Sequence, residues 1–194
     1  MDVAALQKYR RRELKEEGPT AMVSTQELVN APGLLAQEHK NLSIVQKAEL
    51  LDATRWSLEF SFEQIKKLVR YMSVYGVPAE TVLFREGEKN AYMVLIVKGR
   101  VDVVKFDSQR IPKKMTTLGP GKTIGEMSII DGEPRSASAV TRTEATLFVM
   151  TAEQFAGLNQ ALPGIGITLA LKIAKQMSQY LRQTSGRLID HLDV

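Results

Sequence analysis

The spacing of apolar residues along the chain changes twice, near Tyr71 and near Thr151. Before Tyr71, apolar residues recur every three or four positions, which is the period of an amphipathic helix. Between the two points they form short runs rich in β-branched residues, and after Thr151 the helical period returns. The pattern therefore predicts helices at both ends of the chain and a β-rich part between them.

Capping signals divide the N-terminal helical part. Residues 2–17 predict an amphipathic helix that ends at Gly18-Pro19. A Ser-x-x-Glu/Gln pattern, in which the two side chains satisfy each other's backbone N–H groups, then starts at Ser24, Ser43 and Ser61. We therefore expect residues 1–60 to be a mostly helical extension.

The β-rich part contains six short runs that predict strands, at residues 82–84, 91–97, 100–106, 111–118, 137–142 and 145–150. Only Lys98-Gly99 separates the second run from the third, which predicts a two-residue hairpin turn. Many short strands joined by turns indicate a small sandwich or barrel. Residues 61–160 are the predicted extent of this domain, with its flanking short helices.

Residues 161–194 predict one long C-terminal helix. Thr151 caps a short helix over 152–158, and Pro163 suits the first turn of a helix that continues to about His191. Its apolar positions step by threes and fours: Ile165, Leu169, Ile173, Met177, Leu181 or Tyr180, and Leu188. This stripe is expected either to pack on the β-rich domain or to form the seam with a second copy of the chain.

The amino-acid composition excludes several kinds of functional site. The chain has 194 residues, is 44% hydrophobic and 25% charged, and contains no cysteine, so it is globular and has no disulfide or thiolate site. Its two histidines, His39 and His191, are far apart and have no acids at ligand spacing, so no metal site is expected. The apolar run Met93 to Val97 is too short to span a membrane, and charge begins at Asp2, so we expect a cytoplasmic protein without membrane insertion.

The net charge of +4 is mild and does not by itself indicate nucleic-acid binding. The basic run from Lys8 to Lys15 is interleaved with glutamates. We interpret it as a solvated helix face, with docking of an acidic partner as the alternative.

The candidate chemistry lies in residues 119–142. A carboxylate, Glu126, follows Gly125, and a short apolar turn leads to Asp131-Gly132. A single cation, Arg135, comes next and is followed by small residues. One acid and one guanidinium nine residues apart can hold a sugar hydroxyl and a phosphodiester, because arginine pairs bidentately with phosphate. The alternative is an ordinary surface ion pair beside a turn.

The string Gly125-Glu126-x-Ser128, then Pro134-Arg135-Ser136-Ala137, resembles the phosphate-binding cassette of cyclic-nucleotide-binding domains, most closely that of the bacterial catabolite activator proteins. The resemblance covers about residues 60–194 and includes Glu86-Gly87 through Gly99-Arg100-Val101. It implies that Glu126 takes the ribose 2′-hydroxyl and that Arg135 takes the phosphate oxygens. The full set of ligand contacts that it implies is Gly125, Glu126, Met127, Ser128, Arg135, Ser136, Ala137, Thr184 and Ser185.

The resemblance also implies a fold and an assembly. The fold is α+β: a small antiparallel β-barrel or jelly roll flanked by helices. In the activator family the long helix pairs with its twin, so a homodimer is expected, in which Thr184 and Ser185 reach the adenine, one from each subunit. A helix-turn-helix module would follow Leu192-Asp193, and the chain stops at Val194, so no direct DNA binding is expected.

The expected function is an intracellular cyclic-nucleotide sensor that acts through an unidentified protein partner and is not an enzyme. Ser136 suggests cAMP as the ligand, because cGMP-selective relatives often carry threonine there; cGMP stays the other candidate, and no other cofactor is expected. Three alternatives remain: an enzyme that hydrolyses a cyclic phosphodiester, a scaffold that binds no nucleotide, and a kinase regulatory subunit with Arg11-Arg12-Glu13-Leu14 as pseudosubstrate.

Overall fold

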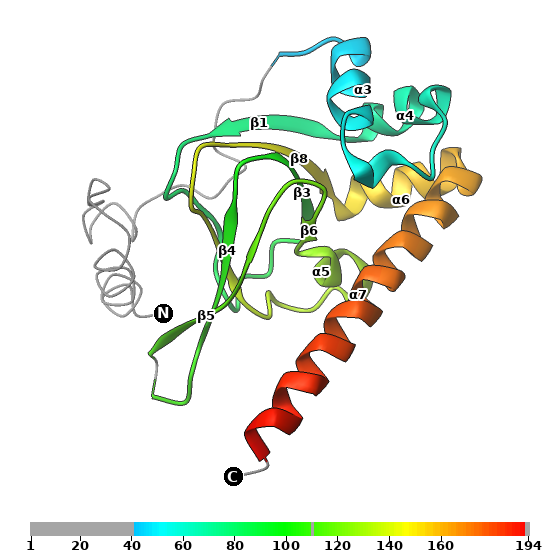
Figure 1. Ribbon diagram of the computed structural model, residues 1–194. Coiled ribbons are helices and arrows are strands. Elements are labelled where there is room, and N and C mark those ends of the chain that lie inside the picture. The colour runs from blue at the N-terminus through cyan, green and yellow to red at the C-terminus, as the bar shows by residue number, and fades with distance from the viewer. Residues whose placement is uncertain (1–40, 110, 193–194) are drawn as a thin grey trace.

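The computed structural model describes residues 41–109 and 111–192. The predicted helix over 2–17, the cap at Ser24 and the basic run from Lys8 lie outside the described residues. Along the chain, helices come before and after a β-rich centre, and one short helix lies between its strands (Figure 1). The helices are α3 (Ile44–Asp52), η2 (Arg55–Ser57), α4 (Phe62–Leu68), η3 (Val69–Tyr71), α5 (Glu126–Asp131), α6 (Ala152–Ala161) and α7 (Pro163–Leu192).

The predicted helix starts are confirmed at Ser43 and Ser61. Each serine side chain accepts a hydrogen bond from the backbone N–H three residues on, and the glutamine there reaches back to the serine N–H. Thr151 starts α6 with the same reciprocal pair of bonds. These caps satisfy N–H groups that the first helical turn leaves free, so each helix begins where its sequence signal stands.

The β-rich centre is a jelly roll, which confirms the predicted fold class. Within the described residues its strands form two antiparallel sheets of four, in the orders β1-β8-β3-β6 and β2-β7-β4-β5, rather than a closed barrel. The strands are β1 (Ser73–Val77), β2 (Val82–Phe84), β3 (Tyr92–Lys98), β4 (Val101–Phe106), β5 (Pro112–Leu118), β6 (Thr123–Ile124), β7 (Ser138–Thr141) and β8 (Ala145–Thr151).

The predicted hairpin at Lys98-Gly99 is wrong. Strand β3 pairs with β6 and β8, whereas β4 pairs with β5 and β7, so the chain crosses from one sheet to the other at this turn. Gly99 permits the crossing because its φ is +91° and a side chain there would overlap the backbone of Glu144 and Ala145. Strands β1 and β6 were not predicted.

The sheet that contains β3 is buried on both faces. Met93 and Leu95 belong to an apolar cluster with the helices, and Val94 and Ile96 belong to the cluster between the two sheets. This explains why β3 is an unbroken apolar run instead of an alternating one. The helical side of the core includes Leu51 and Trp56, so the predicted boundary at residue 60 lies inside a packed group of helices.

Helix α7 runs along the side of the molecule, past α5 (Figure 1). Its predicted stripe is buried at Ile165, Leu169 and Ile173, which pack into the chain's own core. These three positions are therefore not an exposed dimer seam. At 3.6 residues per turn, the exposed apolar residues of α7 lie on the opposite side of the helix: Ile167, Leu171, Leu181 and Ile189.

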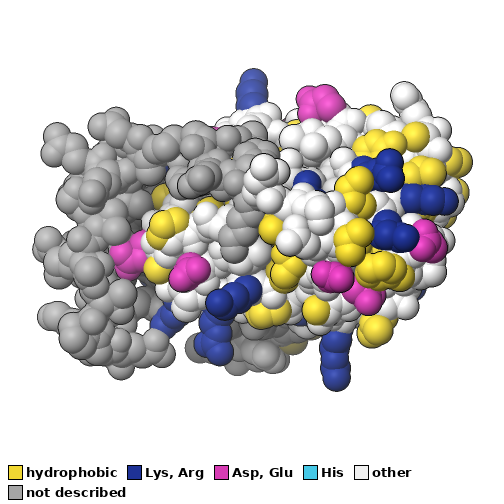
Figure 2. Space-filling model, turned by 90° about the horizontal axis from the view of Figure 1, so that it is seen from above, with side chains coloured by type: hydrophobic (Ala, Val, Ile, Leu, Met, Phe, Trp, Pro, Cys, Tyr) yellow, Lys and Arg dark blue, Asp and Glu magenta, His cyan; other side chains and the backbone are white. Residues whose placement is uncertain are grey.

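An ion pair and a cation–π contact also hold the first half of α7 against the N-terminal helices. Lys172 pairs with Glu59 and lies 5.3 Å from the centre of the Trp56 ring. Figure 2 looks down on this helical end, where hydrophobic side chains are scattered among charged ones. Of the described helices, none is both long enough and apolar enough for a membrane crossing.

Candidate functional site

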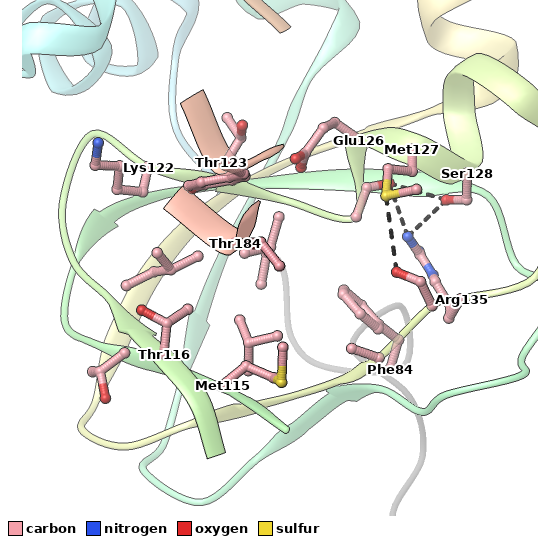
Figure 3. Close-up of a pocket in the computed structure, with 18 of the residues that line it drawn as sticks. Phe84, Met115, Thr116, Lys122, Thr123, Glu126, Met127, Ser128, Arg135 and Thr184 are labelled. Carbon is pink, nitrogen blue, oxygen red and sulfur yellow. Dashed lines mark hydrogen bonds between the residues drawn. The ribbon is translucent and has the colours of Figure 1, made fainter. Parts of the chain in front are cut away.

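A cavity of about 430 Å³ lies against the predicted cassette. Its walls come from β5, from residues 122–128, from residues 134–137 and from α7. The predicted site residues that line it are Gly125, Glu126, Met127, Ser128, Arg135, Ser136, Ala137 and Thr184. Ser185, also predicted, is exposed and is not among the lining residues. Figure 3 shows Arg135 and Ser128 at one side of the cavity and Lys122 and Thr116 at the other.

The Arg135 side chain is held by hydrogen bonds from two of its three guanidinium nitrogens, Nη1 and Nε. Nη1 donates to the carbonyl oxygens of Tyr92 at 2.7 Å and Gly125 at 3.0 Å. It also donates to Ser128 Oγ at 2.7 Å, and Nε donates to Asn90 Oδ1 at 3.3 Å. These acceptors fix the plane of the guanidinium before any ligand arrives.

Two aromatic rings flank the same guanidinium. The Arg135 Cζ atom lies 4.1 Å from the centre of the Phe84 ring and 4.3 Å from that of Tyr92. A cation over an aromatic face is stabilised by the ring quadrupole, most strongly where water is excluded, and Arg135 is 3% exposed. The rings therefore help to hold a permanent positive charge in the interior.

The third nitrogen of the guanidinium makes no hydrogen bond to the described residues. Arg135 Nη2 is buried and has no hydrogen-bond partner among the described residues. A buried donor without a partner carries a desolvation cost of roughly 1–3 kcal/mol or more for a charged group. An anion on the cavity side would satisfy it, since guanidinium binds phosphate oxygens well.

Glu126 is the second ionisable group of the cassette in the cavity wall. It is 5% exposed, and its Oε2 atom has no hydrogen-bond partner within the described part of the chain. Burial raises the pKa of Glu126 to about 7, although a hydrogen bond from Gln176 and the charge of Arg135 act in the opposite direction. The carboxylate can thus accept a further hydrogen bond from a ligand hydroxyl.

The buried carboxylate predicts that Glu126→Gln stabilises the protein without ligand. Between pH 4.5 and about 7 the folded state holds a proton on Glu126 that the unfolded state has lost, so the free energy of unfolding falls as pH rises through this range. Above this range the destabilisation by the buried charge is complete, at roughly 3 kcal/mol. Chemical denaturation should show the variant gaining that amount at pH 8 and little at pH 4.5. Equal gains at both pH values would contradict the assignment.

Two side chains of helix α7, one beside the cavity and one in its lining, were missed by sequence analysis as parts of the site. Gln176 donates to both the carbonyl oxygen and Oγ1 of Thr123, at 3.0 and 2.7 Å, and so joins α7 to β6. One turn later, Tyr180 lines the cavity, and its hydroxyl has no partner among the described residues. Tyr180 and Gln176 precede the predicted Thr184 by four and eight positions. Positions four apart share a helix face, so this spacing could have identified both residues.

Phe84 and Tyr92 were also missed as site residues. They lie on β2 and β3, more than 40 positions before Arg135 in the chain, and nothing local in the sequence connects them to it. Ser136 is exposed, and its hydroxyl lies 3.9 Å from the Met127 sulfur. Among the described residues, no cluster of His, Cys, Asp and Glu could hold a metal ion.

The arrangement combines a fixed cation, a carboxylate acceptor and apolar walls around one cavity. Phe84, Ile124 and Met127 are among the apolar residues of its lining, and a flat, largely apolar ring system would find contacts there. Among the described residues, the buried side-chain groups left unpaired are one donor, one acceptor and one phenol. A ligand that is anionic at one end and carries a hydroxyl and an apolar ring system matches this set.

Three kinds of comparison find similar proteins. The family model of the cyclic nucleotide-binding domain matches residues 76–161, which include the whole cassette. A cyclic nucleotide-gated potassium channel of Rhizobium etli is 32% identical over 141 residues, covering 71% of this chain and 38% of the channel. The cyclic AMP receptor protein of Thermus thermophilus is 26% identical over 117 residues, covering 60% of this chain and 54% of that protein.

The fold comparison agrees with the sequence comparisons. A crystal structure of a cyclic nucleotide-binding domain from Methylobacillus flagellatus matches with a TM-score of 0.66 and 28% identity, covering 75% of this chain and 82% of that one. The chain spans about half the length, or less, of the two curated relatives named above.

Proposed function

The chain contains a cyclic nucleotide-binding domain, homologous to that of the cAMP receptor proteins, and we propose on this basis that it is a cyclic-nucleotide sensor whose ligand is cAMP. The observation that carries the proposal is the pair of unpaired atoms in the cavity wall, Arg135 Nη2 and Glu126 Oε2. A cyclic phosphodiester supplies the anion for the first, and a ribose hydroxyl supplies the donor for the second.

The proposal includes a binding role without catalysis. Relatives found by sequence are named as potassium channels and transcriptional regulators. Glu126, the acid of the cassette, is assigned to the sugar, which leaves Arg135 as a binder of the phosphate and not as a proton-transfer group. We propose cAMP rather than cGMP as the ligand because residue 136 is serine.

Signalling through a protein partner, without direct DNA binding, is the second part of the proposal. Its support is the outer side of α7, where Leu171, Leu181 and Ile189 are exposed by 57%, 70% and 59%. Apolar side chains grouped on one helix face are typical of an interaction surface. The homodimer stays a prediction, and this outer face is the surface of α7 on which we now place it.

Calorimetric titration tests the ligand. We expect one cAMP to bind per chain and cGMP to bind more weakly. We expect 5′-AMP to bind far more weakly than either, because its phosphate carries an extra charge and is not closed into a ring with the ribose. Chromatography of the incubated ligand should return unchanged cAMP. Absence of heat with every nucleotide would favour the scaffold alternative, and recovery of 5′-AMP would favour the hydrolase alternative.

A further inference from the structure

The Tyr180 hydroxyl is a buried polar group that the cassette does not explain. Its side chain comes from α7, lines the cavity and packs against the apolar cluster between the sheets. The hydroxyl has no hydrogen-bond partner among the described residues. Leaving a buried hydroxyl unpaired is unfavourable, whereas phenylalanine would give the same packing without that cost.

Tyr180 and Glu126 both line the cavity. The Glu126 carboxylate, after burial, is the cause that raises the pKa of the Tyr180 phenol to about 12, so the two groups interact electrostatically. The phenol therefore keeps its proton at neutral pH and is a donor. Yet neither the hydroxyl nor Glu126 Oε2 has a hydrogen-bond partner in the described part of the structure, so the two are not bonded to each other.

A group placed between them must donate to the carboxylate and accept from the phenol. A hydroxyl does both at once. A phosphate oxygen only accepts and would be repelled by the carboxylate, and an exocyclic amine of a base only donates. A water molecule also has the required chemistry, so an experiment must separate a ligand hydroxyl from a water.

We propose that Tyr180 is a specificity-determining residue that binds the ligand's 2′-hydroxyl together with Glu126. The 2′-hydroxyl accepts a hydrogen bond from the Tyr180 phenol and donates one to the Glu126 carboxylate. The inference rests on the proposed function and goes beyond it, because it assigns ribose selectivity to a residue of α7. Gln176 already joins the preceding turn of α7 to Thr123. A bond from Tyr180 to the ligand fastens the next turn, so that a ribose ligand, but not a deoxyribose ligand, holds α7 against the site.

The test is a double comparison of Tyr180→Phe and wild type with cAMP and 2′-deoxy-cAMP, by calorimetry. Tyr180→Phe should weaken cAMP binding by about tenfold, since a hydroxyl polarised by a carboxylate makes a stronger than average bond. It should leave the affinity for 2′-deoxy-cAMP within about twofold, because that ligand cannot use the phenol. Arg182→Ala is the control on the same helix: its side chain is exposed and does not line the cavity.

The outcomes separate this inference from the proposed function. If wild type binds cAMP and Tyr180→Phe weakens both ligands equally, or neither, the phenol does not read the 2′-hydroxyl and the inference fails alone. A water bridge gives that result, since it is present with either ligand. If wild type binds no cyclic nucleotide, the proposed function fails and takes the inference with it.

Discussion

Replacing Arg135 by alanine is expected to weaken cAMP binding by about 30- to 4,000-fold and to leave the protein folded. Removing one partner of a buried, hydrogen-bonded charge pair costs roughly 2–5 kcal/mol, and each 1.4 kcal/mol is a factor of ten in affinity. Arg135 is 3% exposed, so its attraction for the phosphodiester is poorly screened by water. Calorimetric titration of the folded variant measures the loss.

The geometry explains why no neighbour can replace the lost guanidinium. Arg135 lies against the rings of Phe84 and Tyr92 and is fixed through Nη1, so Nη2 is held in place for the ligand. A lysine at this position would carry the charge but would lack the planar fork, and we expect it to recover only part of the affinity. The cavity that alanine leaves lies beside the ligand cavity and can admit water to the freed acceptors.

Lys122 provides the matched control. It also lines the cavity, but it is exposed, and an exposed charge contributes about 0–1 kcal/mol. Lys122→Ala should therefore change cAMP affinity by less than about fivefold. Circular dichroism confirms that each variant is folded. If folded Arg135→Ala binds cAMP like wild type, the cyclic-nucleotide proposal fails.

The site is built at a cost to the unliganded protein. Arg135 Nη2, Glu126 Oε2 and the Tyr180 hydroxyl are unpaired atoms of residues that line one cavity, and burial opposes the charge on Arg135 and on Glu126. Such groups are destabilising until something pairs with them. Held in place in advance, they lose little freedom when a ligand binds, which is what preorganisation contributes to affinity.

Features that depend on neighbouring residues in the chain were predicted well. The caps at Ser43 and Ser61 and the start of α7 at Pro163 rest on a few adjacent positions, and the structure has them as predicted. The cassette was predictable for the same reason: Gly125 to Ala137 are contiguous, so the candidate acid and cation appear together in the sequence.

Features that depend on distant contacts were not. Lys98-Gly99 has the length and composition of a hairpin turn, and only the pairing of β3 with β8 and of β4 with β7 shows that it joins two sheets. Strand β6 has two residues, too few for any periodic signal. The role of Tyr180 depends on which side of α7 faces the cavity, and the packing of Ile165 to Ile173 on the core determines that.

Replacing Gly125 by alanine is expected to reduce cAMP affinity by at least about 30-fold, although the new side chain is only one methyl group. Gly125 has a φ of +74° and precedes α5. A Cβ atom there would overlap Arg135 Nη1 and would lie 2.9 Å from the Tyr92 carbonyl oxygen. The guanidinium would have to leave the place that its hydrogen bonds to Gly125, Tyr92 and Ser128 define.

Gly132 makes the result interpretable. It follows α5 with a φ of +72°, nearly that of Gly125, and apart from Gly132 and its chain neighbours no atom of the described residues lies within 4 Å of where its Cβ would be. Gly132→Ala therefore carries only the cost of a left-handed backbone, about 1–2 kcal/mol. Gly125→Ala carries the same cost and the overlap with Arg135, so it should lose more stability than Gly132→Ala in chemical denaturation.

The comparison between Gly125→Ala and Gly132→Ala separates the effect of displacing Arg135 from the effect of backbone strain. Gly132→Ala should keep cAMP affinity within about threefold of wild type, because its strain does not reach Arg135. Gly125→Ala should lose affinity and stability together. If both variants lose affinity equally, the cause is the strain at the ends of α5. If neither does, the guanidinium has room to move and its fixed position is not what binds the ligand.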